Sequence, residues 1–376
     1  MAYPVLAQDR SVPFVGGAEV QQVAIATSLV RRGYRVSMVC HDHGWPDGEP
    51  VRGVRVWRMC GPSDGLPVLR FVHPRLTSLW SAMARADADI YYQRTSGATT
   101  GFVAAYARRH GRASIFAGAH DLDFEPALPL IRYGRDKAIY RWGVRHATRI
   151  VVQTEHQQRR CRELFGREAT RIDSCYAHAG LPSSHDGVIL WVATVKPIKR
   201  PELFLDLAQA LPNHRFRLVG GPDGTAQSRA CFDAVRARAA RLPNVELTGF
   251  VPVADVEQHF DAASVFVNTS LGEGFPNTFL QAWSRAMPTV SFFDAGNAPD
   301  GEPAGIVVPD LSAMVRAVDA LKAEPRRWSA AGERVRRCFE QRHSADRIAD
   351  AYEQLIAELL APRRNGPSAV ARPARP

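Results

Sequence analysis

Apolar and polar positions along the chain follow two periods, and their alternation predicts an α/β fold. Residues 18–33, AEVQQVAIATSLVRRG, repeat apolar side chains every three to four positions, which predicts a helix ending at Gly33. The runs YRVSMVC, ADIYYQR, ASIFAGA and TRIVVQT are short and rich in β-branched or aromatic residues, as strands are. Strands that alternate with helices indicate a mostly parallel sheet with helices on both faces.

A Gly-, Pro- and Ser-rich stretch at residues 180–187, GLPSSHDG, interrupts this pattern and predicts a linker. The alternation restarts with VILWVAT and continues through RFRLVGG, NVELTGF, SVFVNTS and PTVSF. We therefore predict two doubly wound, Rossmann-like domains, residues 1–182 and 183–340, with a ligand in the cleft between them, beyond the carboxyl ends of the strands. A last helix at 341–361 is expected to pack back towards the first domain, and the tail 362–376 to be disordered.

Composition narrows the class of protein. The chain of 376 residues is long enough for two domains, and no run approaches the roughly 18 apolar residues of a membrane span. With no signal-peptide pattern at its start, we predict a cytoplasmic protein. Its six cysteines are scattered without metal-ligand spacing, so buried free thiols are expected and no metal site.

Positive charge is concentrated in the first half. Residues 1–182 hold 25 Lys and Arg against 16 Asp and Glu, while the remainder holds 23 against 22. No nucleic-acid motif accompanies the charge, so we expect an anionic small molecule or surface and no nucleic acid as the partner.

A Gly-Gly pair precedes the first helix in FVGGAEVQQV. Gly16 and Gly17 would let the backbone approach a phosphate closely, although a tight turn explains two glycines equally well. The preceding MAYPVLAQDRSVPF supplies only a short apolar run, so the first strand is predicted to be abbreviated or clipped.

The segment VNTSLGEGFPNTFLQAW carries an acid in the loop before a helix. Pro276 suits a first helical position, which leaves the N–H groups of Asn277 and Thr278 free for a diphosphate. Glu273 would accept hydrogen bonds from hydroxyl groups, and Gln281 would reach a ribose. The alternative for Glu273 is a charge that merely stabilises the helix N-terminus.

A third segment, WVATVKPIKRPELF, ends a buried strand in a basic loop. Lys196, Lys199 and Arg200 are placed to stabilise negative charge on a diphosphate, with a solvated basic loop as the alternative.

Together VGGAEVQQ, WVATVKPIKRPELF, LVGGP, NVELTGFVP and SLGEGFPNTFLQAW resemble the retaining glycosyltransferases of family 4, which have GT-B architecture and use nucleotide-diphosphate sugars. The resemblance implies that Glu273 contacts the donor sugar, and it places His120 near the reacting sugar from the opposite domain. It implies a donor site made of Gly16, Gly17, Thr194, Lys199, Gly274, Phe275, Asn277, Thr278 and Gln281.

Two positions depart from the family pattern. Gln281 stands where a second glutamate binds the ribose, and Thr194 stands where an arginine usually follows a glycine. We hypothesise that Lys196 or Arg200 replaces the lost phosphate cation. A neutral Gln281 can still bond a ribose hydroxyl, so Gln281→Glu would be expected to tighten nucleotide binding.

On the acceptor side, His120 and Asp121 end a strand of the first domain, and Arg94 ends another. The segment LPLIRYGRDKAIYRWGVRHATR is a basic amphipathic helix that could lie on an anionic membrane carrying a lipid-linked acceptor, or could be a solvated face. The sequence thus predicts a metal-independent retaining glycosyltransferase that needs no cofactor besides its donor and acts on a hydroxyl acceptor in polysaccharide or glycolipid synthesis. The alternatives are a GT-B epimerase and a weakened homologue that only binds nucleotide.

Overall fold

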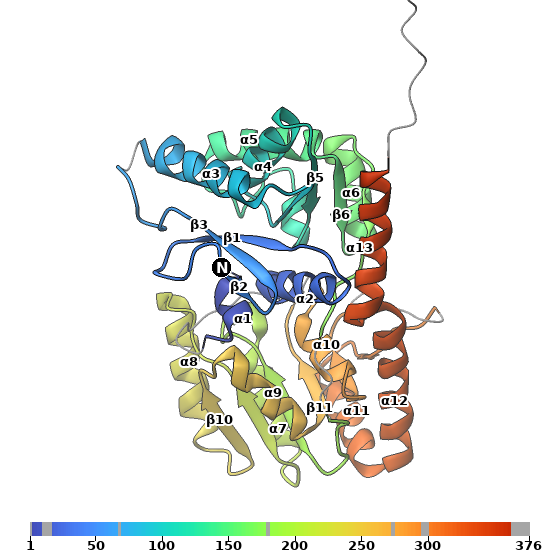
Figure 1. Cartoon of the computed structure of the whole chain (residues 1–376). Helices are drawn as coiled ribbons and strands as arrows, with labels where there is room; N and C mark the ends of the chain where they lie inside the picture. The colour runs from blue at the N-terminus through green and yellow to red at the C-terminus, as the bar shows by residue number, and fades with distance from the viewer. Residues whose placement is uncertain are drawn as a thin grey trace, which may run out of the picture.

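The computed structural model describes residues 2–9, 17–66, 69–177, 181–271, 275–294 and 301–361, which form two α/β parts stacked on each other (Figure 1). The predicted tail lies outside the described residues. The first part contains α1 (Tyr3–Ala7), α2 (Gly17–Arg31), β1 (Ser37–His41), β2 (Pro50–Val51), β3 (Val54–Met59), α3 (Thr77–Ala86), β4 (Ile90–Arg94), α4 (Ala98–Arg109), β5 (Ala113–Ala117), α5 (Gly134–His146), β6 (Arg149–Val152), α6 (Glu155–Phe165) and β7 (Thr170–Arg171). Short helical turns η1 (Leu69–Phe71), η2 (Val72–Leu76) and η3 (Asp121–Phe124) interrupt its loops.

Strands of the first part form two sheets. One has the order β1-β3-β2, in which only β2 is antiparallel, and the other is the parallel sheet β4-β5-β6-β7. The parallel arrangement agrees with the sequence pattern. The division into two sheets does not follow from that pattern.

The second part contains β8 (Val188–Val192), α7 (Pro201–Ala210), β9 (Phe216–Val219), α8 (Ala226–Ala239), β10 (Val245–Gly249), α9 (Val253–Asp261), β11 (Ala263–Asn268), α10 (Asn277–Trp283), β12 (Thr289–Ser291), β13 (Ile306–Val307), α11 (Leu311–Ala323) and α12 (Pro325–Cys338). The turn η4 (Pro197–Lys199) follows β8, and η5 (Phe339–His343) follows α12.

One parallel sheet, in the order β10-β9-β8-β11-β12-β13, forms the centre of the second part. Apolar clusters cover both of its faces, and β8 supplies them alternately. Ile189 and Trp191 pack with α7, α8 and α11, whereas Val188 and Leu190 pack with α9, α10 and α12. This period of two explains why the strand reads as a continuous apolar run.

The last helix, α13 (Ala345–Leu360), runs beside the first part (Figure 1). Ile348, Tyr352 and Leu355 pack against strands β5 and β6. Arg32, directly after α2, forms ion pairs with Asp350, at 2.6 Å, and with Glu353. The chain therefore crosses from the second part back to the first.

Candidate active site

Strand order in the second part marks where a ligand would bind. Counted along the chain, the order is 3-2-1-4-5-6, which reverses direction between β8 and β11. In open parallel sheets the crevice beyond the carboxyl ends at such a reversal is the ligand site. The loop after β8 belongs to the basic segment WVATVKPIKRPELF, and the loop after β11 belongs to the glycine-containing segment VNTSLGEGFPNTFLQAW. Both segments were predicted from the sequence to bind the donor.

These two loops are braced against each other by hydrogen bonds. The Thr269 hydroxyl accepts a bond from the indole of Trp191 at 2.9 Å and donates to the Lys199 carbonyl at 2.8 Å. The Leu271 amide donates to the Ile198 carbonyl at 3.1 Å. Lys199 is therefore held by its main chain at the edge of the crevice, with Thr194 half-buried in the same loop.

Lys196 and Arg200 of this loop form contacts within the second part. The Lys196 ammonium lies 2.8 Å from Asp223 and holds the pKa of that carboxyl well below its usual range. Arg200 donates to the Thr269 carbonyl at 2.8 Å, and its guanidinium lies 4.7 Å from the centre of the Phe292 ring. These contacts argue against our hypothesis that Lys196 or Arg200 replaces the missing arginine.

Helices α2 and α10 meet across the cleft between the two parts. Pro276 is the N-cap residue of α10 and Asn277 its first residue, one position later than we predicted. The Asn277 side chain accepts a hydrogen bond from the Gln21 amide at 2.6 Å. A Cβ atom added to Gly17 would lie only 2.0 Å from the Asn277 amide nitrogen, so the absence of a side chain at Gly17 allows this approach.

A network of buried amides connects this contact to the acceptor side. Gln21 accepts bonds from Arg94 at 2.7 Å and from Gln153 at 3.0 Å, and these three side chains are all at least 92% buried. The Gln153 main-chain amide donates to the Gln157 side chain at 2.9 Å, and Gln157 donates to Asp121 at 2.9 Å. Five side chains from the first part thus support the Asn277 end of α10.

The network changes the role expected of Arg94. Its guanidinium is 5% exposed and also bonds the Tyr92 hydroxyl at 3.3 Å, so it supports Gln21 from beneath the cleft and is not exposed to an acceptor. Arg94 Nε is buried without a partner among the described residues.

His120 lies at the exposed start of the turn η3. Its Nδ1 accepts a hydrogen bond from the Leu122 amide at 3.0 Å, so the ring proton of the neutral form is on Nε2. Asp123 fixes the same loop by accepting bonds from the Ala119 and His120 amides at 2.8 and 3.1 Å. The neutral ring therefore keeps Nε2–H as a hydrogen-bond donor.

Gln281 and Phe275 are occupied by contacts within the second part. The Gln281 amide donates to Glu257 at 2.8 Å, and Glu257 forms an ion pair with the fully buried Arg285 at 2.7 Å. The Phe275 ring stacks on His343 at a centroid distance of 4.8 Å. Thr278 is half-buried in the first turn of α10.

Three predicted site residues, Gly16, Glu273 and Gly274, lie outside the described residues, and their roles stay predictions. Within the described ranges, no group of His, Cys, Asp or Glu side chains is arranged to hold a metal ion. All six cysteines are free, as predicted; four are buried, as also predicted, whereas Cys60 and Cys231 are half-buried. No helix of the described chain is long and apolar enough to cross a membrane.

Sequence reasoning missed Gln21, Gln153 and Gln157. Gln21 lies in the first helix after the Gly-Gly pair, and Gln153 directly follows the buried strand β6. For Gln21 and Gln153, an amide next to apolar positions was the available signal, because a buried polar side chain requires a partner. Gln157 lies in the polar sequence EHQQRRCRELF, which gives no such signal.

Two family models match the chain. The model described as "Glycosyl transferases group 1" matches residues 186–324, and the model described as "Glycosyl transferase 4-like domain" matches residues 16–174. Together they span both parts and both loops of the crevice.

Individual proteins resemble the chain over nearly its whole length. A D-inositol 3-phosphate glycosyltransferase of Kineococcus radiotolerans is 26% identical over 94% of this chain and 93% of its own. A sucrose-phosphate synthase from Thermosynechococcus elongatus superimposes with a TM-score of 0.73 at 18% identity, covering 92% of this chain and 94% of its own. The Anabaena protein HepE, in complex with UDP and glucose, superimposes with a TM-score of 0.71 at 16% identity, covering 92% of this chain and 97% of its own.

Proposed function

Because this chain belongs to the group 1 glycosyl transferases with a 4-like amino-terminal domain, we propose that it moves a sugar from a nucleotide-diphosphate sugar to a hydroxyl acceptor with retention of configuration. The observation that carries the proposal is the meeting of α2 and α10 at the sheet reversal. There Gly17 and Asn277 face each other beside the Lys199 loop.

Each side of the cleft contributes a different part of the reaction. Lys199 stabilises the negative charge that grows on the leaving diphosphate, because a positioned cation acts most strongly where charge develops. His120 donates from Nε2 to the donor sugar from the opposite side of the cleft. The buried amides around Gln21 are positioning residues, since they hold Asn277 without reaching a substrate themselves.

Retention and metal independence rest on the family resemblance and on this chemistry. The leaving diphosphate receives the acceptor proton on the face it departs from, so the acceptor attacks from that same face. Lys199 supplies the positive charge that a metal ion would otherwise provide. Glu273, outside the described residues, is the residue proposed to hold the donor sugar.

The comparisons suggest the first substrates to test. HepE has been solved with UDP-glucose and with UDP and glucose, so UDP-glucose is our first candidate donor. Curated relatives act on D-inositol 3-phosphate, which makes phosphorylated polyols the first acceptors to compare with the glycolipid and polysaccharide acceptors that we propose.

Product analysis tests this proposal. The chain is incubated with UDP-glucose with and without each acceptor, and the anomeric configuration of the product is determined by NMR. We expect a product only when an acceptor is present, with the α-configuration of the donor. An altered sugar formed without acceptor would indicate an epimerase. Binding of UDP with no turnover across donors and acceptors would indicate a weakened homologue that only binds nucleotide. This is the second candidate, because Gln281 is hydrogen-bonded to Glu257 and Thr194 stands where the family pattern has an arginine.

We also propose that the surface around α5 contacts an anionic membrane. Arg132, Arg135 and Arg145 are exposed there, beside the exposed apolar side chains of Leu130, Tyr133 and Trp142. Cations beside exposed aromatic and aliphatic groups suit the headgroup region of an anionic bilayer. Lys137 and Arg141 donate to the carbonyls of Ala127 and Pro126, so they are less available for lipid.

A further inference from the structure

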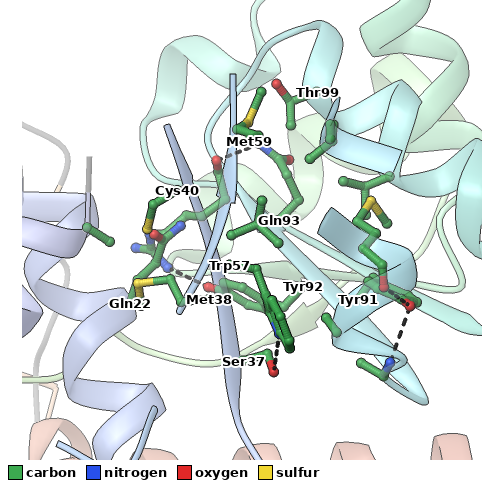
Figure 2. Close-up of a pocket in the computed structure, with 18 of the residues that line it drawn as sticks. Gln22, Ser37, Met38, Cys40, Trp57, Met59, Tyr91, Tyr92, Gln93 and Thr99 are labelled. Carbon is green, nitrogen blue, oxygen red and sulfur yellow. Dashed lines mark hydrogen bonds between the residues drawn. The ribbon is translucent and has the colours of Figure 1, made fainter. Parts of the chain in front are cut away.

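A large cavity in the first part does not include the donor side of the cleft. Its volume is about 1850 Å³, and Figure 2 shows side chains such as Met38, Cys40 and Tyr92 along its lining. All of its lining residues belong to the first part or to α13. The polar groups of α10 that lie at the cleft are therefore separate from this cavity.

One face of α10 is less buried than the rest of the helix. Asn277, Thr278 and Gln281 are half-buried, whereas the other side chains of the helix are buried. Residues four positions apart lie on the same face of a helix, so Gln281 lies one turn behind Asn277. Because Asn277 contacts Gln21 across the cleft, Gln281 is the next polar group on the cleft side of α10.

Glu257 of α9 accepts hydrogen bonds from three side chains. Its Oε1 accepts from the Gln281 amide at 2.8 Å and from the Tyr176 hydroxyl, and its Oε2 accepts from Arg285 at 2.7 Å. Arg285 is fully buried and also donates from Nε to Asp261 at 2.7 Å. Tyr176 and Arg285 therefore hold the Glu257 carboxylate in place beside Gln281.

This contact determines how the Gln281 amide is oriented. An ionised carboxylate has only acceptor atoms, whereas a side-chain amide has a donor end and an acceptor end. The nitrogen of Gln281 must therefore face Glu257, which leaves its Oε1 turned away from the carboxylate. Within the part of the chain that the structure describes, this oxygen has no hydrogen-bond partner.

We propose that Glu257 is a positioning residue for the nucleotide, which holds the Gln281 amide so that Oε1 accepts a hydrogen bond from a ribose hydroxyl. Between Asn277 and Gln281 the helix rises by about 6 Å. This rise is comparable with the separation between a phosphate at the N-terminus of α10 and the hydroxyl groups of the ribose that carries it. Gln281 thus supplies the acceptor atom although it stands where the family pattern has a glutamate.

Glu257 and Gln281 together divide the work of one glutamate. The carboxylate at Glu257 is stabilised by Arg285, and the neutral amide of Gln281 contacts the ligand. A ligand that lacks the hydroxyl would leave Oε1 unpaired, so the site should discriminate against deoxyribose. The inference rests on the nucleotide binding of the proposed function and not on sugar transfer.

Calorimetric affinities for UDP, 2′-deoxy-UDP and 3′-deoxy-UDP test the proposal in the full chain. The wild type should bind the weaker deoxy ligand about 10-fold less tightly than UDP. In Glu257→Gln the neighbouring group can donate as well as accept, so the Gln281 amide is no longer fixed and this ratio should fall to about 2-fold. Gln281→Ala removes Oε1 and should lower the ratio in the same way.

Two further variants separate orientation of the amide from general stability. The exchange variant, Glu257→Gln with Gln281→Glu, reverses the pair and should recover a ratio of about 10-fold or more, because a carboxylate at position 281 also accepts from a hydroxyl. Asp261→Asn is the matched control, since it changes the other carboxylate that contacts Arg285. This control should keep the wild-type ratio.

The outcomes distinguish this inference from the proposed function. A wild-type ratio near 1, a ratio that persists in Glu257→Gln, or equal losses in Glu257→Gln and Asp261→Asn would overturn the role of Glu257 while UDP binding stands. If Glu257→Gln does not fold, Glu257→Asp takes its place, because it withdraws the carboxylate from Gln281 and keeps the charge. A wild type that binds none of UDP, GDP and ADP would contradict the proposed function itself, and the inference with it.

Discussion

Gly17 shows how one absent side chain leaves room for a side-chain contact between the two parts of the molecule. The Asn277 amide occupies the space where a Cβ of residue 17 would lie, and Gln21 fixes that amide. From the sequence, Gly17 was expected to let the backbone approach a phosphate closely. The structure adds close packing against α10.

We predict that Gly17→Ala lowers kcat/KM by about 10-fold or more, because the new methyl group displaces Asn277 from Gln21. Asn277→Ala in the same background should restore part of the loss, since it removes the clash and keeps the Asn277 main-chain N–H. Turnover of the two single variants and the double variant forms a double-mutant cycle. Additive losses would show that the two residues act separately.

Gln281 illustrates a residue for which the structure shows a contact that the sequence did not predict. From sequence alone, Gln281→Glu is expected to tighten nucleotide binding. The structure places its amide 2.8 Å from the Glu257 carboxylate, so a second carboxylate would repel it. We predict that Gln281→Glu lowers the free energy of unfolding at pH 7 by about 1–3 kcal/mol.

Gln281→Ala, which adds no charge, is the control and should cost less than Gln281→Glu at pH 7. Urea unfolding at pH 7 and pH 5 measures both variants. The excess cost of Gln281→Glu should shrink at pH 5. Repulsion between the two neighbouring carboxylates favours the binding of a proton in the folded variant, and the bound proton removes that repulsion. Tighter nucleotide binding with unchanged stability would restore the sequence-based expectation.

At the scale of elements, periodic patterns predicted most helices and strands because local burial determines them. The strand VILWV is buried on both faces and reads as continuously apolar, and its observed bounds Val188–Val192 lie within the predicted run. The division of the first sheet could not be predicted, since it depends on which strands pair and not on any local pattern.

Long-range polar contacts were equally hidden from the sequence. Gln21 and Asn277 lie 256 positions apart, and Gln21 and Gln153 lie 132 apart. Nothing in a helix such as AEVQQVAIA indicates which amide finds a distant partner. The loops of the candidate site were therefore predicted from the sequence, whereas the hydrogen-bond network around Gln21 was not.

The turn η5 joins the two parts through a buried histidine. His343 Nδ1 lies 2.7 Å from the Ser174 carbonyl, and its ring stacks on Phe275. Burial lowers the pKa of His343 to about 4, from about 6.5 in the unfolded chain. The unfolded state thus binds a proton that the folded state does not between these values, and stability is lost as pH falls through this window.

We predict that this histidine contributes about 2 kcal/mol to the loss of unfolding free energy between pH 7.5 and pH 5. His343→Gln keeps a donor for the Ser174 carbonyl and cannot titrate, so the variant should lose correspondingly less over the same range. Urea unfolding at both pH values provides the comparison. Parallel losses in the two proteins would mean that His343 is not the group that titrates.

For the whole molecule, the uneven charge predicts where a membrane would be contacted. We expect the protein to float with anionic vesicles at low salt and to be released as salt increases, because surface attraction is screened beyond about 10 Å at 0.1 M. Arg132→Glu with Arg145→Glu should abolish flotation. The matched control, Arg326→Glu with Arg327→Glu, changes two exposed arginines of α12 in the second part and should float normally. Equal flotation of both variants would indicate a solvated α5 surface.

The central claim is that the crevice at the β8–β11 reversal carries a diphosphate whose charge increases during sugar transfer. The most direct measurement is the turnover of Lys199→Ala against Lys196→Ala, two lysines of one loop, of which Lys196 is paired with Asp223. We predict that Lys199→Ala lowers kcat by about 10² or more with a smaller change in donor affinity, and that Lys196→Ala stays within a few-fold of wild type. Equal turnover of the two variants, or a Lys199→Ala protein as active as wild type, would contradict the placement of the diphosphate in this crevice.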